Sequence, residues 1–200
     1  MKVTKGSNAN GELADPASSA WGGVPSEVVK LAPIALDKQP NAYIREAWQT
    51  RPYGTTSSVA VAAATDGDGL FVRMEWADDA EANGEFQDAA GVIFPAMAGS
   101  PVATMGSADK AVGIWVWAHG REAPLELVSR GPGVASKVGT SISASARLAD
   151  GKWSVVLRGP ASAAQFGEVG FVVWNGSRAE RAGLGSVSQQ WLPIENAGGV

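Results

Sequence analysis

The chain has 200 residues, a formal net charge of −4 and no cysteine. The absence of cysteine excludes disulfides, iron–sulfur clusters, thiolate zinc sites and covalently attached c-type haem. The single histidine, His119, excludes a bis-histidine haem and a three-histidine zinc site. Lysine and arginine are scattered along the chain, which indicates neither a nucleic-acid footprint nor a basic run for a membrane surface.

The length suits one domain with a substantial core. We find no internal repeat, linker or domain boundary, and we expect a loose lead-in over residues 1–20 followed by a single domain over 21–200. The longest apolar runs fall far short of the ~20 residues that span a bilayer. The N-terminus lacks the apolar core of a signal peptide, which leaves open a cytoplasmic protein or a mature exported form.

Elements in the first half of the chain are predicted from hydrophobic alternation and turn residues. Residues 28–36 predict an edge strand, because Pro33 would not suit a central one. Residues 45–55 look irregular. The clear pattern then comprises, in order, a strand from Val59, a turn over Thr65–Gly69, a strand with Leu70, Val72, Met74 and Trp76 on one face, and an acidic loop over 78–84.

The second half holds the most apolar segments. Residues 86–95 and 112–118 are apolar on both faces, which indicates central strands or a strand covered by a ligand. The rest comprises a helical turn or loose strand over 122–129, a Gly-Pro loop over 130–139, a hairpin turning at Asp150-Gly151, a short helix over 161–166, a strand over 169–174 and a last strand near 187–192. The chain therefore predicts an all-β fold, a β-sandwich of about eight to ten mostly antiparallel strands with short helices in its loops.

Tryptophan is abundant, with eight residues, and four of them lie on predicted core strands: Trp115, Trp117, Trp153 and Trp174. One interpretation is that they fill a thick sandwich core. The other is a flat apolar pocket for a planar or cyclic ligand, either haem or a sugar. Trp115 and Trp117 are two residues apart in one strand and therefore share a face, as a pocket wall requires.

A methionine, Met105, lies in the loop between the two most apolar strands and is followed by Gly106. Most methionines are soft core filler. A thioether is also a ligand of haem iron that raises the reduction potential. Met97, eight residues earlier, is a second candidate in a weaker context.

Several short motifs become specific when their order and spacing are taken together. They are Asp15-Pro16 with Trp21; Asp66 to Trp76; Phe86-x-Asp88-Ala89-Ala90 with Phe94-Pro95; Thr104-Met105-Gly106 before Val112-x-Ile114-Trp115-x-Trp117; Gly151-x-Trp153-x-Val155-Val156-x-Arg158; and Val173-Trp174-Asn175-Gly176-Ser177 leading to Glu180-Arg181. With these motifs the chain resembles the haem-b-binding γ subunits of periplasmic molybdenum enzymes, namely ethylbenzene dehydrogenase, dimethylsulfide dehydrogenase and the selenate and chlorate reductases.

The resemblance covers most of the chain and implies both a fold and a cofactor. Such subunits are antiparallel β-sandwiches that hold one non-covalent haem b, and the methionine of the Met-Gly loop, here Met105, is an axial ligand of the iron. Pocket walls are then expected from Phe94, Trp115, Trp117 and Trp174, and a cation such as Arg158 could pair with a propionate. The lack of Cys-x-x-Cys-His agrees with a b-type haem.

One position departs from the pattern of the family. The other axial ligand is commonly a lysine just before a Ser-x-Ser near the C-terminus, and the matching residue here is Gly185. Glycine has no side chain to offer iron, so either another residue or water fills the site, or the site stays open, or the haem has been lost. Lys110 is expected to point to solvent, and the strand 112–117 separates His119 from the methionine loop.

Two functions of different classes follow. The first is a haem-b electron-transfer subunit, not an enzyme by itself, which relays single electrons between a molybdenum catalytic subunit with its iron–sulfur subunit and a soluble cytochrome-type partner. This function implies a mature periplasmic form. The second is a haem-free ligand- or carbohydrate-binding β-sandwich on the same scaffold, which Gly185 favours. The two functions differ in whether Trp115 and Trp117 face an interior slot beside Met105 or an open surface; a plainer third interpretation is a structural subunit of a larger complex.

Overall fold

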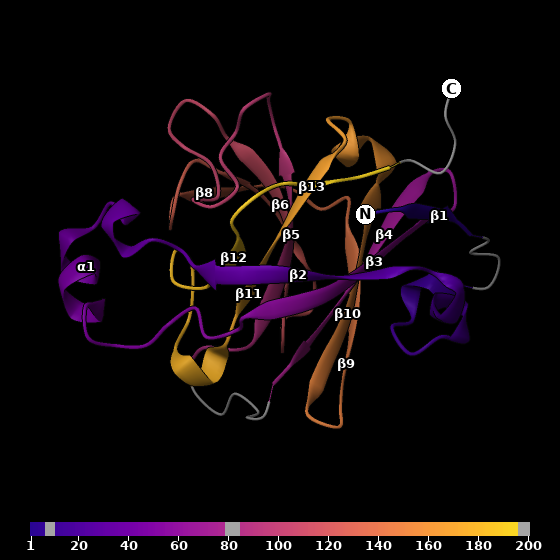
Figure 1. Cartoon of the computed structure of the whole chain (residues 1–200), viewed down its shortest axis with the longest axis horizontal. Helices are drawn as coiled ribbons and strands as arrows, with labels where there is room; N and C mark the ends of the chain where they lie inside the picture. Colours follow the sequence, from indigo (N-terminus) through magenta and orange to yellow (C-terminus); the bar gives the residue numbers. More distant parts are fainter. Residues whose placement is uncertain (7–10, 79–84, 196–200) are drawn as a thin grey trace.

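The computed structural model describes residues 1–6, 11–78 and 85–195 (Figure 1). Within these residues the chain forms one α-helix, α1 (Ala42–Trp48), and five short 3-10 helices: η1 (Glu12–Ala14), η2 (Ser19–Gly23), η3 (Leu36–Lys38), η4 (Ala161–Ala164) and η5 (Gly176–Arg178). The strands are β1 (Val3–Lys5), β2 (Ser26–Pro33), β3 (Ser58–Thr65), β4 (Gly69–Ala77), β5 (Ala89–Pro95), β6 (Val112–Ala118), β7 (Leu125–Ser129), β8 (Ala135–Gly139), β9 (Ser143–Ala149), β10 (Lys152–Pro160), β11 (Glu168–Trp174), β12 (Ser186–Ser188) and β13 (Leu192–Pro193).

Eleven of the named strands lie on one hydrogen-bonded path, which runs β8-β7-β6-β5-β11-β12-β2-β3-β4-β10-β9. Off this path, β1 pairs with β3 and β13 pairs with β11. Strand β2 is the corner of this path and crosses the middle of the molecule in Figure 1. Its residues 26–30 pair with β3, whereas residues 31–33 pair with β12. We call the strands β1, β3, β4, β9 and β10 the first sheet, and β5–β8 with β11–β13 the second sheet. Among the named strands only the β1–β3 pair is parallel.

The two sheets face each other across an inner apolar core, as the alternation of side chains predicts. Leu70, Val72, Met74 and Trp76 all belong to this core, which confirms the shared face predicted for β4. The sheets approach each other closely at Gly159 of β10. Only glycine fits there, because a Cβ would overlap the ring of Trp115 of β6.

The all-β class and the antiparallel arrangement are confirmed, with more strands than the eight to ten that we predicted. Strand β8 lies where a Gly-Pro loop was predicted, because it is an exposed edge strand without an apolar face. Strand β2 is not an edge strand; Pro33 is tolerated because it ends the strand. Helix α1 lies partly within the segment predicted as irregular, and Asn41 caps it by accepting from the Tyr43 amide at 2.9 Å.

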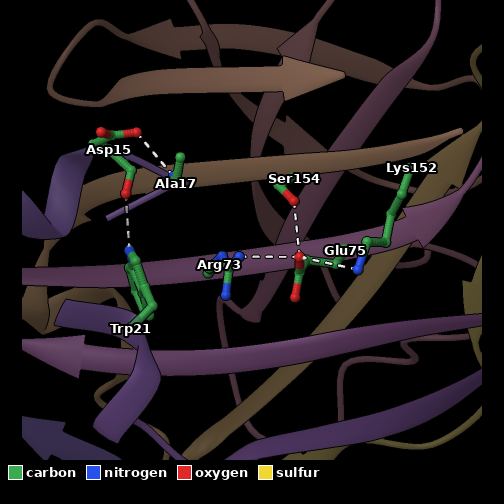
Figure 2. A network of polar contacts seen from close by, with 7 residues as sticks. All are labelled: Asp15, Ala17, Trp21, Arg73, Glu75, Lys152 and Ser154. Carbon is green, nitrogen blue, oxygen red and sulfur yellow. Dashed lines mark hydrogen bonds and ion pairs between the residues drawn. The ribbon is translucent and has the colours of Figure 1, made fainter. Parts of the chain in front are cut away.

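The described residues of the N-terminal segment are packed rather than loose. Strand β1 adds to the first sheet, and Leu13 of η1 is 2% exposed in an apolar cluster on the outer face of that sheet. Trp21 belongs to the same cluster, and its Nε1 donates to the Asp15 carbonyl at 3.2 Å (Figure 2). The Asp15 carboxylate accepts from the Ala17 amide at 2.8 Å. The Asp-Pro…Trp motif therefore closes the turn that docks this segment.

Figure 2 also shows the polar contacts that hold Trp21 in place. The Arg73 guanidinium lies 5.9 Å from the centre of the Trp21 ring, and its Nη2 is 3.0 Å from Glu75 Oε1. The same Glu75 oxygen accepts from the Ser154 hydroxyl at 2.8 Å and lies 3.6 Å from Lys152 Nζ. These contacts join β4 and β10 under the N-terminal segment. Nowhere in the described residues is a helix both long and apolar enough to cross a membrane.

Candidate functional site

Met105 lies on the outer face of the second sheet, in the loop that joins β5 to β6. It is 3% exposed and adopts a left-handed backbone conformation, with φ of 52°. Its amide donates to the Val102 carbonyl at 2.8 Å, and its carbonyl accepts from the Gly131 amide at 3.2 Å. Both main-chain polar groups are thus satisfied, and the backbone of the methionine is fixed against the β7–β8 connection.

The glycine that follows is required by the same turn. Gly106 has φ of 92°, and a Cβ there would lie 2.6 Å from the Ser129 carbonyl oxygen. Its amide donates to the Pro101 carbonyl at 2.8 Å. Only glycine combines this conformation with so close a backbone contact. The Met-Gly pair is therefore a structural unit that presents a thioether on the sheet.

A pocket of about 230 Å³ lies beside Met105. Its lining residues come from the methionine loop, β6, β7, β8, β11 and the segment after η5: Met105, Ile114, Leu127, Ser129, Gly133, Ala135, Trp174 and Ala182. Three of the lining residues, Gly133, Ala135 and Ala182, are exposed and form the rim of the pocket. Met105 and Trp174 are buried. The walls are almost wholly apolar, and the thioether is the one soft donor atom among them.

Trp174 closes the pocket on the side of Gly185. Its Nε1 donates to the Ala182 carbonyl at 2.9 Å. A Cβ on Gly185 would lie 2.6 Å from Trp174 Cδ1 and 2.8 Å from Nε1. The indole therefore fills the space into which any side chain at position 185 would project.

The structure brings together two of the five predicted site residues, Met105 and Trp174. The other three, Phe94, Trp115 and Trp117, face the inner core on the opposite side of the second sheet, so the prediction that they line a pocket with Met105 is wrong. The rings of Phe94 and Trp115 contact each other with centroids 4.6 Å apart. The two tryptophans do not face a slot beside Met105. Both belong to the inner core, and Trp117 also lines a surface pocket with His119 and Trp153.

The other side chains considered as ligands also lie elsewhere. The His119 ring packs on Trp153, with centroids 5.1 Å apart. Arg158 belongs to the first sheet, where its Nη2 is 3.8 Å from Asp66 Oδ2, so it is not beside the methionine pocket. The Lys110 ammonium lies next to Gly99, and Met97 is 42% exposed. Across the described residues no three His, Asp or Glu side chains gather as a metal site.

Of the residues that line the pocket, the sequence predicted only Met105 and Trp174. Ile114 precedes Trp115 in β6 and therefore lies on the opposite face of the sheet, and Leu127 of β7 pairs with Ile114. Both side chains thus lie on the outer face with the methionine loop. The alternation that put Trp115 and Trp117 on one face also put Ile114 on the other. What the sequence did not reveal was that the methionine loop covers the face without the tryptophans.

Several of the motifs shared with the family hold the fold rather than the pocket. Asp88 is fully buried, and its carboxylate accepts from Trp153 Nε1 at 3.2 Å and from the Gly176 amide at 2.8 Å. Its carbonyl accepts from the His119 amide at 2.8 Å. One aspartate thus joins the start of β5, the end of β6, β10 and η5.

Glu180 is a second buried carboxylate, 1% exposed, that fixes the segment leading to the pocket rim. It accepts from the Thr55 amide at 3.1 Å and from the Asn175 amide at 2.9 Å. Burial raises the pKa of Glu180, and the hydrogen bonds from Asn175 and Thr55 oppose part of that rise. The carboxyl group is thus more easily protonated in the folded chain than in the unfolded chain.

This shift predicts a pH dependence of stability. Because the folded state binds the proton more tightly, the free energy of unfolding falls as pH rises from the ordinary Glu value of 4.5 through the higher folded pKa. Glu180→Gln carries no titrating group and should lose this decline. Urea unfolding of both proteins at a series of pH values measures it. Parallel pH profiles for the two proteins would show that Glu180 contributes nothing.

The chemistry of the pocket suits a haem better than its size does. A methionine thioether and apolar walls are features of haem sites. The volume of about 230 Å³ is smaller than the ~300–1,000 Å³ of most sites for organic ligands. The rim residues belong to two segments, 131–135 and 181–185, which approach each other where the Gly183 amide nitrogen lies 3.8 Å from a Cβ position on Gly133.

Comparisons with known proteins identify relatives of this chain. Residues 19–137 match a family described as ethylbenzene dehydrogenase. The chain is 32% identical, over 90% of its length and 68% of the relative, to a protein of Haloferax mediterranei named as a respiratory nitrate reductase heme subunit. It is 33% identical, over 93% of its length and 81% of the relative, to the chlorate reductase subunit gamma of Ideonella dechloratans.

A solved structure shares the fold at low sequence identity. It is a family 9 carbohydrate-binding module from Caldicellulosiruptor kristjanssonii in complex with glucose, with a TM-score of 0.51, 11% identity, and coverage of 100% of this chain and 96% of that one. This likeness concerns the β-sandwich alone. Together, the matched segment and the two relatives show that the chain belongs to the ethylbenzene dehydrogenase family.

Proposed function

We propose that this chain is a haem-b electron-transfer subunit of a molybdenum oxidoreductase, and that the thioether of Met105 binds the haem iron. The observation that carries the proposal is a buried methionine, fixed by backbone hydrogen bonds, whose side chain lines an apolar pocket. The relatives support it, because one is named as a heme subunit of a nitrate reductase and the other as a subunit of chlorate reductase.

A haem bound here would be non-covalent, since the chain has no cysteine to attach it. The bound group supplies a one-electron ferric/ferrous couple. The residues of the chain would hold and insulate that group. Met105 would bind it through its thioether, a type of ligand that raises the reduction potential, and Ile114, Leu127 and Trp174 would exclude water. The proposed role is to relay electrons, with the catalytic reaction taking place on another subunit.

The proposed partners are a molybdenum catalytic subunit, its iron–sulfur subunit and a soluble cytochrome-type protein. Support for the first two comes from relatives that are named as subunits of reductases. The proposed location is the periplasm, in keeping with the resemblance to subunits of periplasmic molybdenum enzymes. Co-purification of the chain with a molybdenum-containing protein from a periplasmic fraction would test both the partners and the location.

Replacing the proposed ligand tests the function directly. Met105→Ala should weaken haem binding at least about tenfold, because losing a ligand costs no less than losing one of its supporting contacts. It should also lower the reduction potential and alter the reduced α and β bands. Met97→Ala, at an exposed methionine of the same connection, is the matched control and should leave the spectrum unchanged. Identical spectra for Met105→Ala and the wild type would remove Met105 as the ligand.

The haem-free binding function remains a second candidate because of two observations. The pocket is small, and Trp174 occupies the space in front of Gly185. In this second function the chain would bind no haem, and the pocket would hold a smaller apolar ligand. Wild-type protein that stays colourless after haem is added would favour this candidate over the first.

A further inference from the structure

We propose that the surface pocket lined by Trp117, His119 and Trp153 binds a small aromatic molecule of one or two rings that carries a hydrogen-bond donor. This pocket shares no lining residue with the pocket beside Met105. The inference is independent of the proposed haem, because it concerns a second site with a ligand of its own.

The pocket lies at an open side of the sandwich. Strand β9 is one end of the hydrogen-bonded path, so no further strand of the described chain extends the first sheet there. Strand β9 forms one wall of the pocket, and the connection from β6 to β7 forms another. Two residues on the inner face of β9, Ala144 and Ala146, are small and leave a hollow beside Trp117 and Trp153.

The size of the pocket suits one or two rings. Its volume is about 330 Å³, larger than the volume of about 230 Å³ beside Met105. An engineered protein cavity of about 150 Å³ takes up benzene. Most sites for organic ligands measure ~300–1,000 Å³. The pocket therefore has the volume of a site for a small organic molecule as it stands, without any movement of its walls.

The aromatic rings of the wall are held in place by the fold. Trp153 Nε1 donates to the buried Asp88 carboxylate at 3.2 Å, and the Trp76 ring stacks on Trp153 with centroids 6.4 Å apart. The Trp117 and His119 rings lie 4.8 Å and 5.1 Å from the Trp153 ring, inclined at 60° and 51°. Aromatic pairs favour inclined, edge-to-face arrangements, so a further ring can join this cluster in the same way.

His119 supplies the polar contact. Its ring is half-buried in the pocket wall, and its nitrogens make no hydrogen bond to any described residue. A neutral imidazole has one acceptor nitrogen, which can accept from an N–H or O–H of the ligand. The Ser145 hydroxyl is already donated to the Ala14 carbonyl. Arg121 and Glu122 at the mouth are exposed and opposite in charge, so the mouth favours neither an anion nor a cation.

The burial of the two tryptophans favours an aromatic ligand over a sugar. Trp117 is 8% exposed and Trp153 is 3% exposed, so neither offers an open ring face on which a sugar could stack. A sugar would also bring several hydroxyl groups against alanine, leucine and tryptophan side chains. Hydroxyl groups that are buried without partners are costly.

The test is a titration of the full chain with indole, followed by the nuclear magnetic resonance signals of the histidine ring protons. Because His119 is the only histidine, these signals report on this pocket alone. We expect saturable binding of one indole per chain and a shift of the His119 signals. Absence of binding, binding that leaves these signals unchanged, or a shift caused by glucose and not by indole would overturn the inference.

Filling the hollow should abolish or weaken binding. Ala146→Leu should weaken indole binding by about tenfold or more, because the larger side chain occupies the space of the ligand. Ala149→Leu is the matched control: the same substitution in the same strand, at a position whose side chain lies on the outer face of the first sheet. It should leave the affinity unchanged. Equal affinities of the two variants would overturn the inference.

A second variant tests the polar contact without filling the pocket. Wild-type protein should bind indole about two- to tenfold more tightly than indene, which has similar fused rings and no N–H, because one hydrogen bond contributes that much. His119→Phe keeps an aromatic ring and removes the acceptor nitrogen, so it should bind the two molecules equally. A preference for indole that persists in His119→Phe would overturn the assignment of the ligand to this pocket.

Discussion

Asp88→Ala is expected to lower the free energy of unfolding by about 3–5 kcal/mol, since two hydrogen bonds to a charged group are lost and two buried donors remain. The donors are Trp153 Nε1 and the Gly176 amide, at 3.2 Å and 2.8 Å from the carboxylate oxygens. No water can replace the acceptor easily, because Asp88 has 0% exposure. Urea unfolding followed by tryptophan fluorescence measures the change.

The matched control is Glu122→Ala, which removes an exposed carboxylate near the end of β6. It should change the free energy of unfolding by less than about 0.5 kcal/mol. The two variants carry the same change in charge, so net charge cannot account for a difference between them. Equal, small effects would show that the Asp88 hydrogen bonds do not hold the four elements together.

Gly106→Ala, which adds one methyl group at the proposed haem site, should lower the free energy of unfolding by about 2–4 kcal/mol. Two causes combine. The residue has φ of 92°, and the new Cβ would lie 2.6 Å from the Ser129 carbonyl oxygen and 3.2 Å from that of Lys110. Backbone atoms cannot move aside as a flexible side chain can, so the methionine turn must shift. Haem affinity should fall with stability, because Met105 is the preceding residue.

Gly120→Ala separates the two causes. Gly120 also has a left-handed conformation, with φ of 73°, but a Cβ there meets nothing within 4 Å. We expect a loss of about 1 kcal/mol, from backbone strain alone, and unchanged haem affinity. Thermal unfolding and a haem titration of both variants give the comparison. If Gly106→Ala were no worse than Gly120→Ala, the close packing of the methionine turn on β7 would be disproved.

The sequence was sufficient for the elements whose burial follows a simple period. Alternation assigned β4 and β10, and continuous apolar composition assigned β5 and β6 as central strands. Alternation also assigned β9 as a strand, although none of its side chains is buried. It was insufficient for β8, since an exposed edge strand carries no apolar alternation. The choice of face for the pocket depends on which side of the second sheet the methionine loop covers, and that is a tertiary property.

The motifs that carried the family resemblance have two kinds of role in the structure. Asp15 and Trp21 dock the N-terminal segment, and Asp88 with Trp153 joins four elements. Those residues stabilise the sandwich whatever it binds. The Met-Gly pair is different, because its turn, with φ of 52° at Met105 and 92° at Gly106, places a thioether in the wall of a pocket. A resemblance based mainly on structural motifs predicts the scaffold, and the methionine turn is the part that bears on the cofactor.

Gly185 shows why a position must be judged with its neighbours. From the sequence alone, a glycine at that position leaves open whether another residue or water binds the iron, whether the site stays open, or whether the haem has been lost. In the structure, Trp174 occupies the adjoining space and donates to the Ala182 carbonyl, so no side chain at position 185 could project there without displacing the indole. Introducing any side chain at position 185 therefore requires a second change at Trp174.

The most direct test of the account is a titration of the purified chain with haem, followed by the absorption spectrum of the oxidised and dithionite-reduced protein and a pyridine haemochrome assay. The account predicts binding of one b-type haem per chain and its loss or weakening in Met105→Ala. Protein that takes up no haem, or takes it up equally well without Met105, would contradict the assignment of the pocket beside Met105 as the haem site.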